Sequence, residues 1–132
     1  MLTPIRLDAA GATHPIKVNV QCDGEDTIGE RLCFAIKEKI RASKGFELVD
    51  VRQAESSPLG FGVHLLSLDA GEEKGNMSAI SVVFTLPQPT PRLDYYLTLR
   101  IMLCGLSRID DQASAILADI DKESDNLRPH SN

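Results

Sequence analysis

The chain has 132 residues, of which 42% are apolar and 25% are charged, a balance typical of one globular domain rather than of a disordered segment. Its 19 acidic residues outnumber its 14 basic ones, and the resulting charge of −5 excludes nucleic acid as the expected partner. No apolar stretch reaches the roughly 18 residues of a membrane-spanning helix, so we expect no membrane insertion of this segment.

The two ends of the chain are expected to lie outside the folded domain. Residues 1–15 contain small residues and two prolines and predict a loose lead-in, while the polar residues 124–132 predict a flexible tail. A single domain is therefore expected over residues 16–123. The first residues lack the pattern of a signal peptide. This predicts a cytoplasmic protein if Met1 is the native start, and a periplasmic or cell-envelope protein if a leader has been removed.

The stretch Asp26–Val51 predicts a capped helix that leads into a strand. Before it, residues 16–22 alternate between apolar and polar side chains, as expected of a half-buried strand. Thr27 and Glu30 have the spacing of a capping box, and Gly45 is a residue that commonly ends a helix. The apolar stripe of this helix consists of Ile28, Leu32, Ala35, Ile36 and Ile40.

The remaining sequence predicts further strands and a second helix. The strands are expected at residues 46–52, 61–69, 77–86 and 94–104, separated by a polar loop at 53–60, a Gly-rich turn and a proline-rich surface loop at 87–91. The last helix is expected to begin at Ser107, with Asp110 completing a capping box. The order β-α-β-β-β-β-α predicts an α+β fold, with both helices on one face of a mixed five-stranded sheet.

The three cysteines, Cys22, Cys33 and Cys104, lie in or beside apolar patterns, and none belongs to a C-x-x-C pair. Their odd number leaves at least one thiol free in a monomer. We interpret all of them as buried structural thiols rather than as redox centres or metal ligands.

Four residues are candidates for a protein interface. Phe34 projects opposite the apolar stripe of the first helix, on a charged face. Tyr96, Arg100 and Met102 lie on the side of the last strand that we expect to face away from the helices. Both surfaces can simply be solvated, but aromatic residues are enriched in interfaces and such a sheet face can meet its own copy. A homodimer is therefore expected.

Ligand binding and catalysis are weaker alternatives. Asp23, Glu25 and Asp26 lie where the first strand ends, a common ligand position in open sheets, but these acids repel phosphate and fall short of a calcium loop. A solvated acidic turn is the main interpretation, and a small-ligand site at the 22–29 loop is the alternative, with His64 as a further ligand-binding candidate. A second alternative is an enzyme centred on His64 with a nearby thiol or acid. No cofactor or metal is expected, because no histidine pair has metal-ligand spacing.

The segment Ile28–Asp50 resembles the opening unit of a group of bacterial envelope domains. These include the amino-terminal domain of the Tol-system propeller protein, the periplasmic domain of the curli secretion channel and related flagellar lipoproteins. The matching residues are Leu32, Ile36, Ile40, Ser43, Gly45, Phe46 and Leu48. The lipid-attachment cysteine of those families is missing, and a polar loop replaces their second helix. The resemblance implies a domain that docks onto other proteins or onto its own copies, with no catalytic residue to carry over. A non-catalytic protein-association domain in a cell-envelope or other multiprotein assembly is the function we expect.

Overall fold

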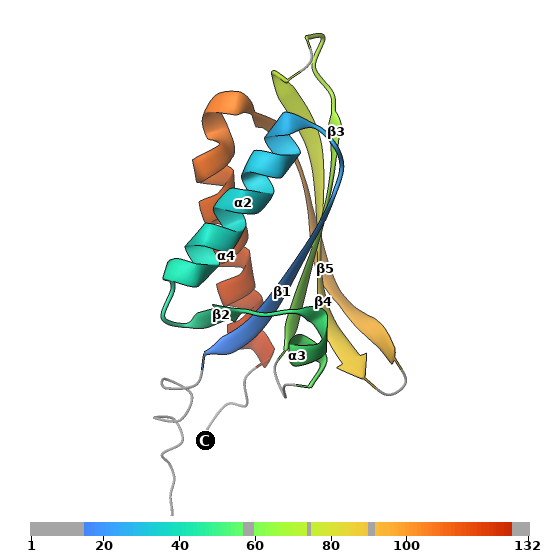
Figure 1. Cartoon of the computed structure of the whole chain (residues 1–132), viewed down its shortest axis with the longest axis vertical. Coiled ribbons are helices and arrows are strands. Elements are labelled where there is room, and N and C mark those ends of the chain that lie inside the picture. The colour runs from blue at the N-terminus through green and yellow to red at the C-terminus, as the bar shows by residue number, and fades with distance from the viewer. Residues whose placement is uncertain (1–14, 57–59, 74, 90–91, 128–132) are drawn as a thin grey trace, which may run out of the picture.

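Two long helices lie side by side on one face of a five-stranded sheet (Figure 1). The computed structural model describes residues 15–56, 60–73, 75–89 and 92–127. Its elements in chain order are β1 (Ile16–Asp23), α2 (Thr27–Ala42), β2 (Phe46–Leu48), α3 (Val51–Glu55), β3 (Phe61–Asp69), β4 (Met77–Pro89), β5 (Arg92–Gly105), the short 3₁₀ helix η1 (Leu106–Arg108) and α4 (Ile109–Leu127).

The strands follow the order β2-β1-β3-β4-β5 across the sheet. β1 runs parallel to β2 and β3, whereas β3, β4 and β5 are joined as antiparallel hairpins. This confirms the predicted α+β fold, with a mixed sheet and the two long helices on one face. The β3–β4 hairpin projects past the ends of both helices (Figure 1).

The core fills the space between the sheet and the two long helices. The predicted stripe of α2 is confirmed, since its isoleucines and Leu32 are fully buried and Ala35 packs against them. The stripe of α4 is confirmed in the same way. The apolar faces predicted for β1, β3 and β4 also point into this core. Its largest fully buried side chains are Phe61, Phe84, Ile28, Leu32, Ile36, Ile40, Leu65, Ile80, Ile116, Ile120, Val18 and Val63.

The short helix α3 replaces part of a predicted strand and of the predicted loop 53–60. β2 ends at Leu48, and Asp50 then caps α3 by accepting a hydrogen bond from the Gln53 amide at 2.9 Å. The Gln53 side chain accepts in return from the Asp50 amide at 3.2 Å, which completes a capping box. The alternation of apolar and polar residues through 46–52 predicts a continuing strand, and it hides the Asp50–Gln53 capping box. A short helix therefore follows the second strand, where the sequence predicted only a continuing strand and a polar loop.

Both predicted helix starts were wrong by one to two residues. Asp26 rather than Thr27 caps α2, since its carboxylate accepts a hydrogen bond from the Gly29 amide at 2.9 Å. The last helix opens with η1 directly after Gly105, without the side-chain cap expected from Ser107. α4 extends to Leu127, beyond the predicted domain boundary at residue 123. The rest of the predicted tail, at 128–132, and residues 1–14 of the lead-in lie outside the described residues.

The proline-rich segment continues a strand where a surface loop was predicted. β4 pairs with β5 through Pro87 and Pro89, opposite Asp94 and Arg92. Its pairing with β3 stops at Thr85, so one edge of β4 is open beyond that point. A proline nitrogen on an open edge has no ladder hydrogen bond to lose, which makes these positions compatible with a strand.

Candidate association surface

β5 reverses its alternation at a β-bulge, and this decides which side chains the helices cover. Thr98 pairs with Phe84 and Tyr96 pairs with Thr85, so Leu97 is the extra residue between them. A strand that gains one residue moves every following side chain to the other face. Sequence alternation alone therefore misassigns the part of β5 beyond Leu97.

Arg100 and Met102 lie on the helix side of the sheet, contrary to the prediction that they face away from it. Met102 is opposite Ile80 and packs against the core, and Cys104 on the same side is fully buried. Arg100 donates two hydrogen bonds to the carboxylate of Asp119 on α4, from Nε to Oδ2 and from Nη2 to Oδ1, the latter at 2.9 Å. These two predicted interface residues instead join β5 to the core and to α4.

The face left uncovered by α2 and α4 carries a cluster of large apolar side chains. On β3 and β5 they alternate with the core residues, and on β4 the smaller Ala79, Ser81 and Val83 lie between them in register. Each of the large side chains is between 46% and 74% exposed. We call this cluster the apolar patch; it consists of Leu66, Leu68, Tyr96, Leu99, Ile101 and Leu103.

The patch is unusual for a surface that faces water. Single exposed apolar residues are common, but here two rows of them, on β3 and on β5, lie on either side of the small β4 residues between them. Such a gathering of apolar side chains marks interaction sites. Of the predicted candidates, Tyr96 lies in this patch. Leu99, Ile101 and Leu103 were missed because their apolar row was expected to face the helices. The sequence did indicate an exposed apolar surface. Both alternating sets of side chains on β5 contain apolar residues, and the helices can bury only one set.

Phe34 lies where the helical spacing placed it, on the outer face of α2 with 65% of its surface exposed. Its helix neighbours Glu38 and Arg41 form an ion pair with each other on the surface. This face of α2 points away from the sheet, so Phe34 and the apolar patch lie on opposite sides of the domain. Its role in an interface stays a prediction.

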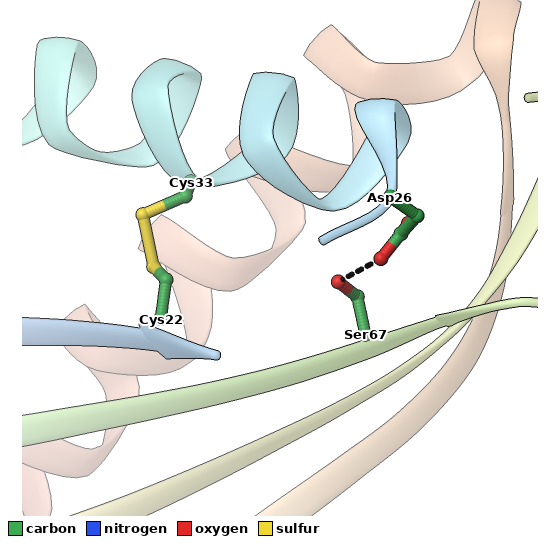
Figure 2. The surroundings of a disulfide bond; sticks show 4 residues. All are labelled: Cys22, Asp26, Cys33 and Ser67. Atoms are coloured by element: carbon green, nitrogen blue, oxygen red, sulfur yellow. Dashed lines mark hydrogen bonds between the residues drawn. A yellow bond between two sulfur atoms is a disulfide. The ribbon is translucent and has the colours of Figure 1, made fainter. Parts of the chain in front are cut away.

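A disulfide joins Cys22, at the end of β1, to Cys33, in the second turn of α2, with 6.4 Å between their Cα atoms (Figure 2). The interpretation of these residues as free buried thiols was wrong. The turn after β1 folds α2 back over its own strand, which brings the end of the strand under the helix. Cys104 is the remaining thiol and is buried as predicted. Its burial raises the pKa of the thiol, against the opposing charge of Arg108.

The Asp26 carboxylate joins α2 to the sheet. It accepts a hydrogen bond from Ser67 Oγ on β3 at 2.6 Å (Figure 2), and another from Ser78 Oγ on β4. Partial burial of the carboxylate opposes ionisation, but these bonds and the one from the Gly29 amide outweigh it, so the pKa of Asp26 is lowered. A Cβ on Gly29 would lie 1.8 Å from Ser67 Oγ, which explains why glycine occupies this close contact.

A shallow depression of about 630 Å³ lies beside this carboxylate. Asp26 is directed at the two serines rather than held free for a ligand, while Asp23 and Glu25 are exposed. His64 does not line the depression. The residues that do are Gly24, Glu25, Asp26, Thr27, Leu66, Ser67, Leu68, Asp69 and Gly75.

His64 lies on the uncovered face of β3, with its Nε2 3.3 Å from Thr85 Oγ1. Cys104 is on the opposite face of the sheet and Cys22 is oxidised. The structure therefore does not bring His64 together with either of the thiols that the sequence suggested as its partners. Within residues 15–56, 60–73, 75–89 and 92–127, no three His, Cys, Asp or Glu side chains gather as a metal site.

Comparison with known proteins found similarity at the level of fold. No protein-family model and no curated protein matches the chain. A single-residue variant of the PelC dodecamer from Paraburkholderia phytofirmans is similar over 86% of this chain and 90% of its own, with 13% identity and a TM-score of 0.50. The hypothetical protein CT253 from Chlamydia trachomatis is similar over 84% of this chain and 98% of its own, again with 13% identity and a TM-score of 0.50. These identities show a shared fold alone.

Among the helices of the described residues, none has both the length and the apolar character needed to cross a membrane.

Proposed function

We propose that this chain is a non-catalytic association domain that binds copies of itself through the apolar patch. The observation that carries the proposal is the row of exposed Leu99, Ile101 and Leu103 on β5, which faces the same side of the sheet as Leu66 and Leu68 on β3, across β4. Removing apolar surface from water contributes about 25 cal/mol per Å², so covering five large side chains is a substantial driving force. The acids of the 23–26 turn give less support to ligand binding, since Asp26 is engaged by Ser67 and Ser78.

The compartment that fits this domain is an oxidising one, such as the bacterial periplasm. Disulfides persist in such compartments and are rare in the cytosol, and Cys22–Cys33 is a structural disulfide. The resemblance of the β1–α2–β2 unit to envelope domains supports the same location. The fold shared with PelC, which is a dodecamer, supports a domain suited to assembly.

Replacing Ile101 with Lys is expected to weaken self-association at least about 10-fold, equal to about 1.4 kcal/mol. Ile101 is the most exposed member of the patch at 74%, so the folded chain tolerates a long side chain there. A buried lysine without a partner would, in contrast, be costly inside an interface. The measurement is the mass in solution across a dilution series, by light scattering coupled to size-exclusion chromatography.

The matched control is Ala118→Lys, which adds the same charge at an exposed site on α4. It should keep the mass of the natural chain. If the natural chain is monomeric at every concentration, or if both lysine variants associate as well as it does, the proposed function is wrong.

Replacing Phe34 with Ser is expected to remove assemblies larger than those held by the apolar patch. Phe34 and the patch lie on opposite sides of the domain, and a domain with two separate contact surfaces builds larger assemblies than one with a single surface. The stability of the fold should change by no more than about 0.5 kcal/mol, because the side chain is largely exposed. An unchanged mass distribution together with unchanged stability would remove Phe34 from the interface.

A further inference from the structure

We infer that the apolar patch is closed by a second copy of this chain, packed face to face with its strands running in the opposite direction. The inference rests on the proposed function and specifies the partner and its orientation. It follows from how charge is distributed along the uncovered face, together with the symmetry of a dimer.

One end of this face is strongly acidic. Asp23 ends β1 on this face, and Glu72 and Glu73, which precede Lys74 in the sequence, follow β3 in the turn to β4. Asp69 ends β3 at the same end, opposite the buried Ser78 and thus on the helix side of the sheet. All of these acidic side chains are exposed. We call this the acidic end. Among these neighbouring carboxylates, none makes an ion pair in the described part of the chain.

The other end of the face has no such excess of negative charge. Lys17 lies at the start of β1 on this face, opposite Glu47 of β2. Arg52, in α3, is exposed at the same end of the sheet. The described charges here, Lys17 and Arg52 against Glu47, Asp50 and Glu55, leave only a small negative excess. The uncovered face is therefore more acidic at one end of its strands than at the other, with the apolar patch between the two ends.

Two identical faces related by a two-fold axis can pack with their strands parallel or antiparallel. Parallel packing would place the acidic end of one copy on the acidic end of the other, and such like-charge contacts cost several kcal/mol. Antiparallel packing places each acidic end near Lys17 and Arg52 of the other copy. The apolar patches overlap in both cases, so charge selects the antiparallel arrangement.

The expected dyad passes close to the middle of β4. Ser81 is opposite Leu66 of β3 and Ile101 of β5, and Val83 is opposite His64 and Leu99. These registers lie halfway along the patch. Residues rise about 3.3 Å each along a strand, so the two copies of Glu72 would lie more than about 30 Å apart. In a parallel dimer they would lie within about 20 Å, because packed sheets are only about 10 Å apart.

Spin labels on introduced cysteines test this orientation in the full chain. Glu72→Cys places one label at each acidic end, and Arg52→Cys places one at each opposite end. The native cysteines do not compete, since Cys104 is buried and Cys22 is bonded to Cys33. We expect double electron–electron resonance to give a distance above about 30 Å for labelled Glu72→Cys alone, and below about 20 Å for mixed Glu72→Cys and Arg52→Cys copies.

The outcomes separate this inference from the proposed function. A short distance between two Glu72→Cys labels in an oligomer that Ile101→Lys disrupts overturns the antiparallel arrangement and leaves the proposed function standing. Several distances that persist in one oligomer of the Phe34→Ser chain indicate a head-to-tail ring and also overturn the two-fold dimer. A monomer at every concentration, with the patch covered by residues 1–14, by lipid or by another protein, overturns both.

Discussion

Removing the disulfide by replacing both Cys22 and Cys33 with Ala is expected to lower the free energy of unfolding by about 3 kcal/mol. Eleven positions separate the two cysteines. Closing a loop of this length removes chain entropy from the unfolded state worth about 3 kcal/mol at 25 °C. For a domain of this size the melting temperature should fall by on the order of 10 °C. The disulfide ties β1 to α2, so its loss also loosens the segment that carries the Asp26 cap.

Urea unfolding of the natural chain, with and without reductant, measures this effect. The reduced natural chain should unfold at nearly the same midpoint as the double variant, and reductant should leave the double variant unchanged. Cys104→Ala serves as the control, because it removes a thiol and no covalent link. Equal midpoints for the oxidised and reduced natural chain would show that the Cys22–Cys33 bond contributes no stability.

The parts of the fold that sequence reasoning placed correctly are those in which local pattern and tertiary packing agree. The stripe of α2 follows helical spacing and is buried by a sheet on one side, so periodicity alone was sufficient. The same holds for the core faces of β1, β3 and β4. The edges of elements were less predictable: Asp50 and Gln53 form a capping box inside what looked like a continuing strand.

The candidate site was only partly predictable, because it depends on a single extra residue in β5. The bulge at Leu97 is invisible to a count of alternating residues, and it exchanges the faces of Arg100 and Leu99. The sequence predicts that the more apolar row of β5, with Leu99, Ile101 and Leu103, packs against the helices, because helices on one face of a sheet normally cover its more apolar side. The structure places that row outward. A local rule fails here in the region that we propose as functional, which is where such failures are expected.

The cysteines and Asp26 were also misjudged for a shared reason. Cys22 and Cys33 become neighbours, and Asp26 meets Ser67 and Ser78, only because α2 folds back across the ends of β1, β3 and β4. Spacing along the chain gives the elements but not the distance between their ends. The acidic turn was therefore interpreted as solvated, although one of its carboxylates is a structural link between helix and sheet.

Replacing Asp26 with Ala is expected to destabilise the fold by about 2 to 4 kcal/mol. Loss of the cap of α2 costs about 1 kcal/mol. The hydroxyl groups of the buried Ser67 and Ser78 would each lose the carboxylate that accepts their hydrogen bond. These residues are only 2% and 1% exposed, so water cannot readily replace the carboxylate. Asp26→Asn keeps the shape and one acceptor oxygen and should lose less. Asp23→Asn removes a nearby exposed charge and should change stability by no more than about 0.5 kcal/mol.

The Asp26 carboxylate should also make the free energy of unfolding fall as the pH is lowered. Its pKa is lower in the folded chain than its ordinary value of 3.8, so the unfolded chain binds the proton first as the pH falls. The contribution of Asp26 is therefore complete above that ordinary value and is lost as the pH falls through the folded pKa. Urea unfolding at about pH 6 and about pH 3 should show the gap between the natural chain and Asp26→Asn shrinking at the lower pH. A gap of equal size at both pH values would mean that the hydrogen bonds from Ser67 and Ser78 do not depend on the charge of Asp26.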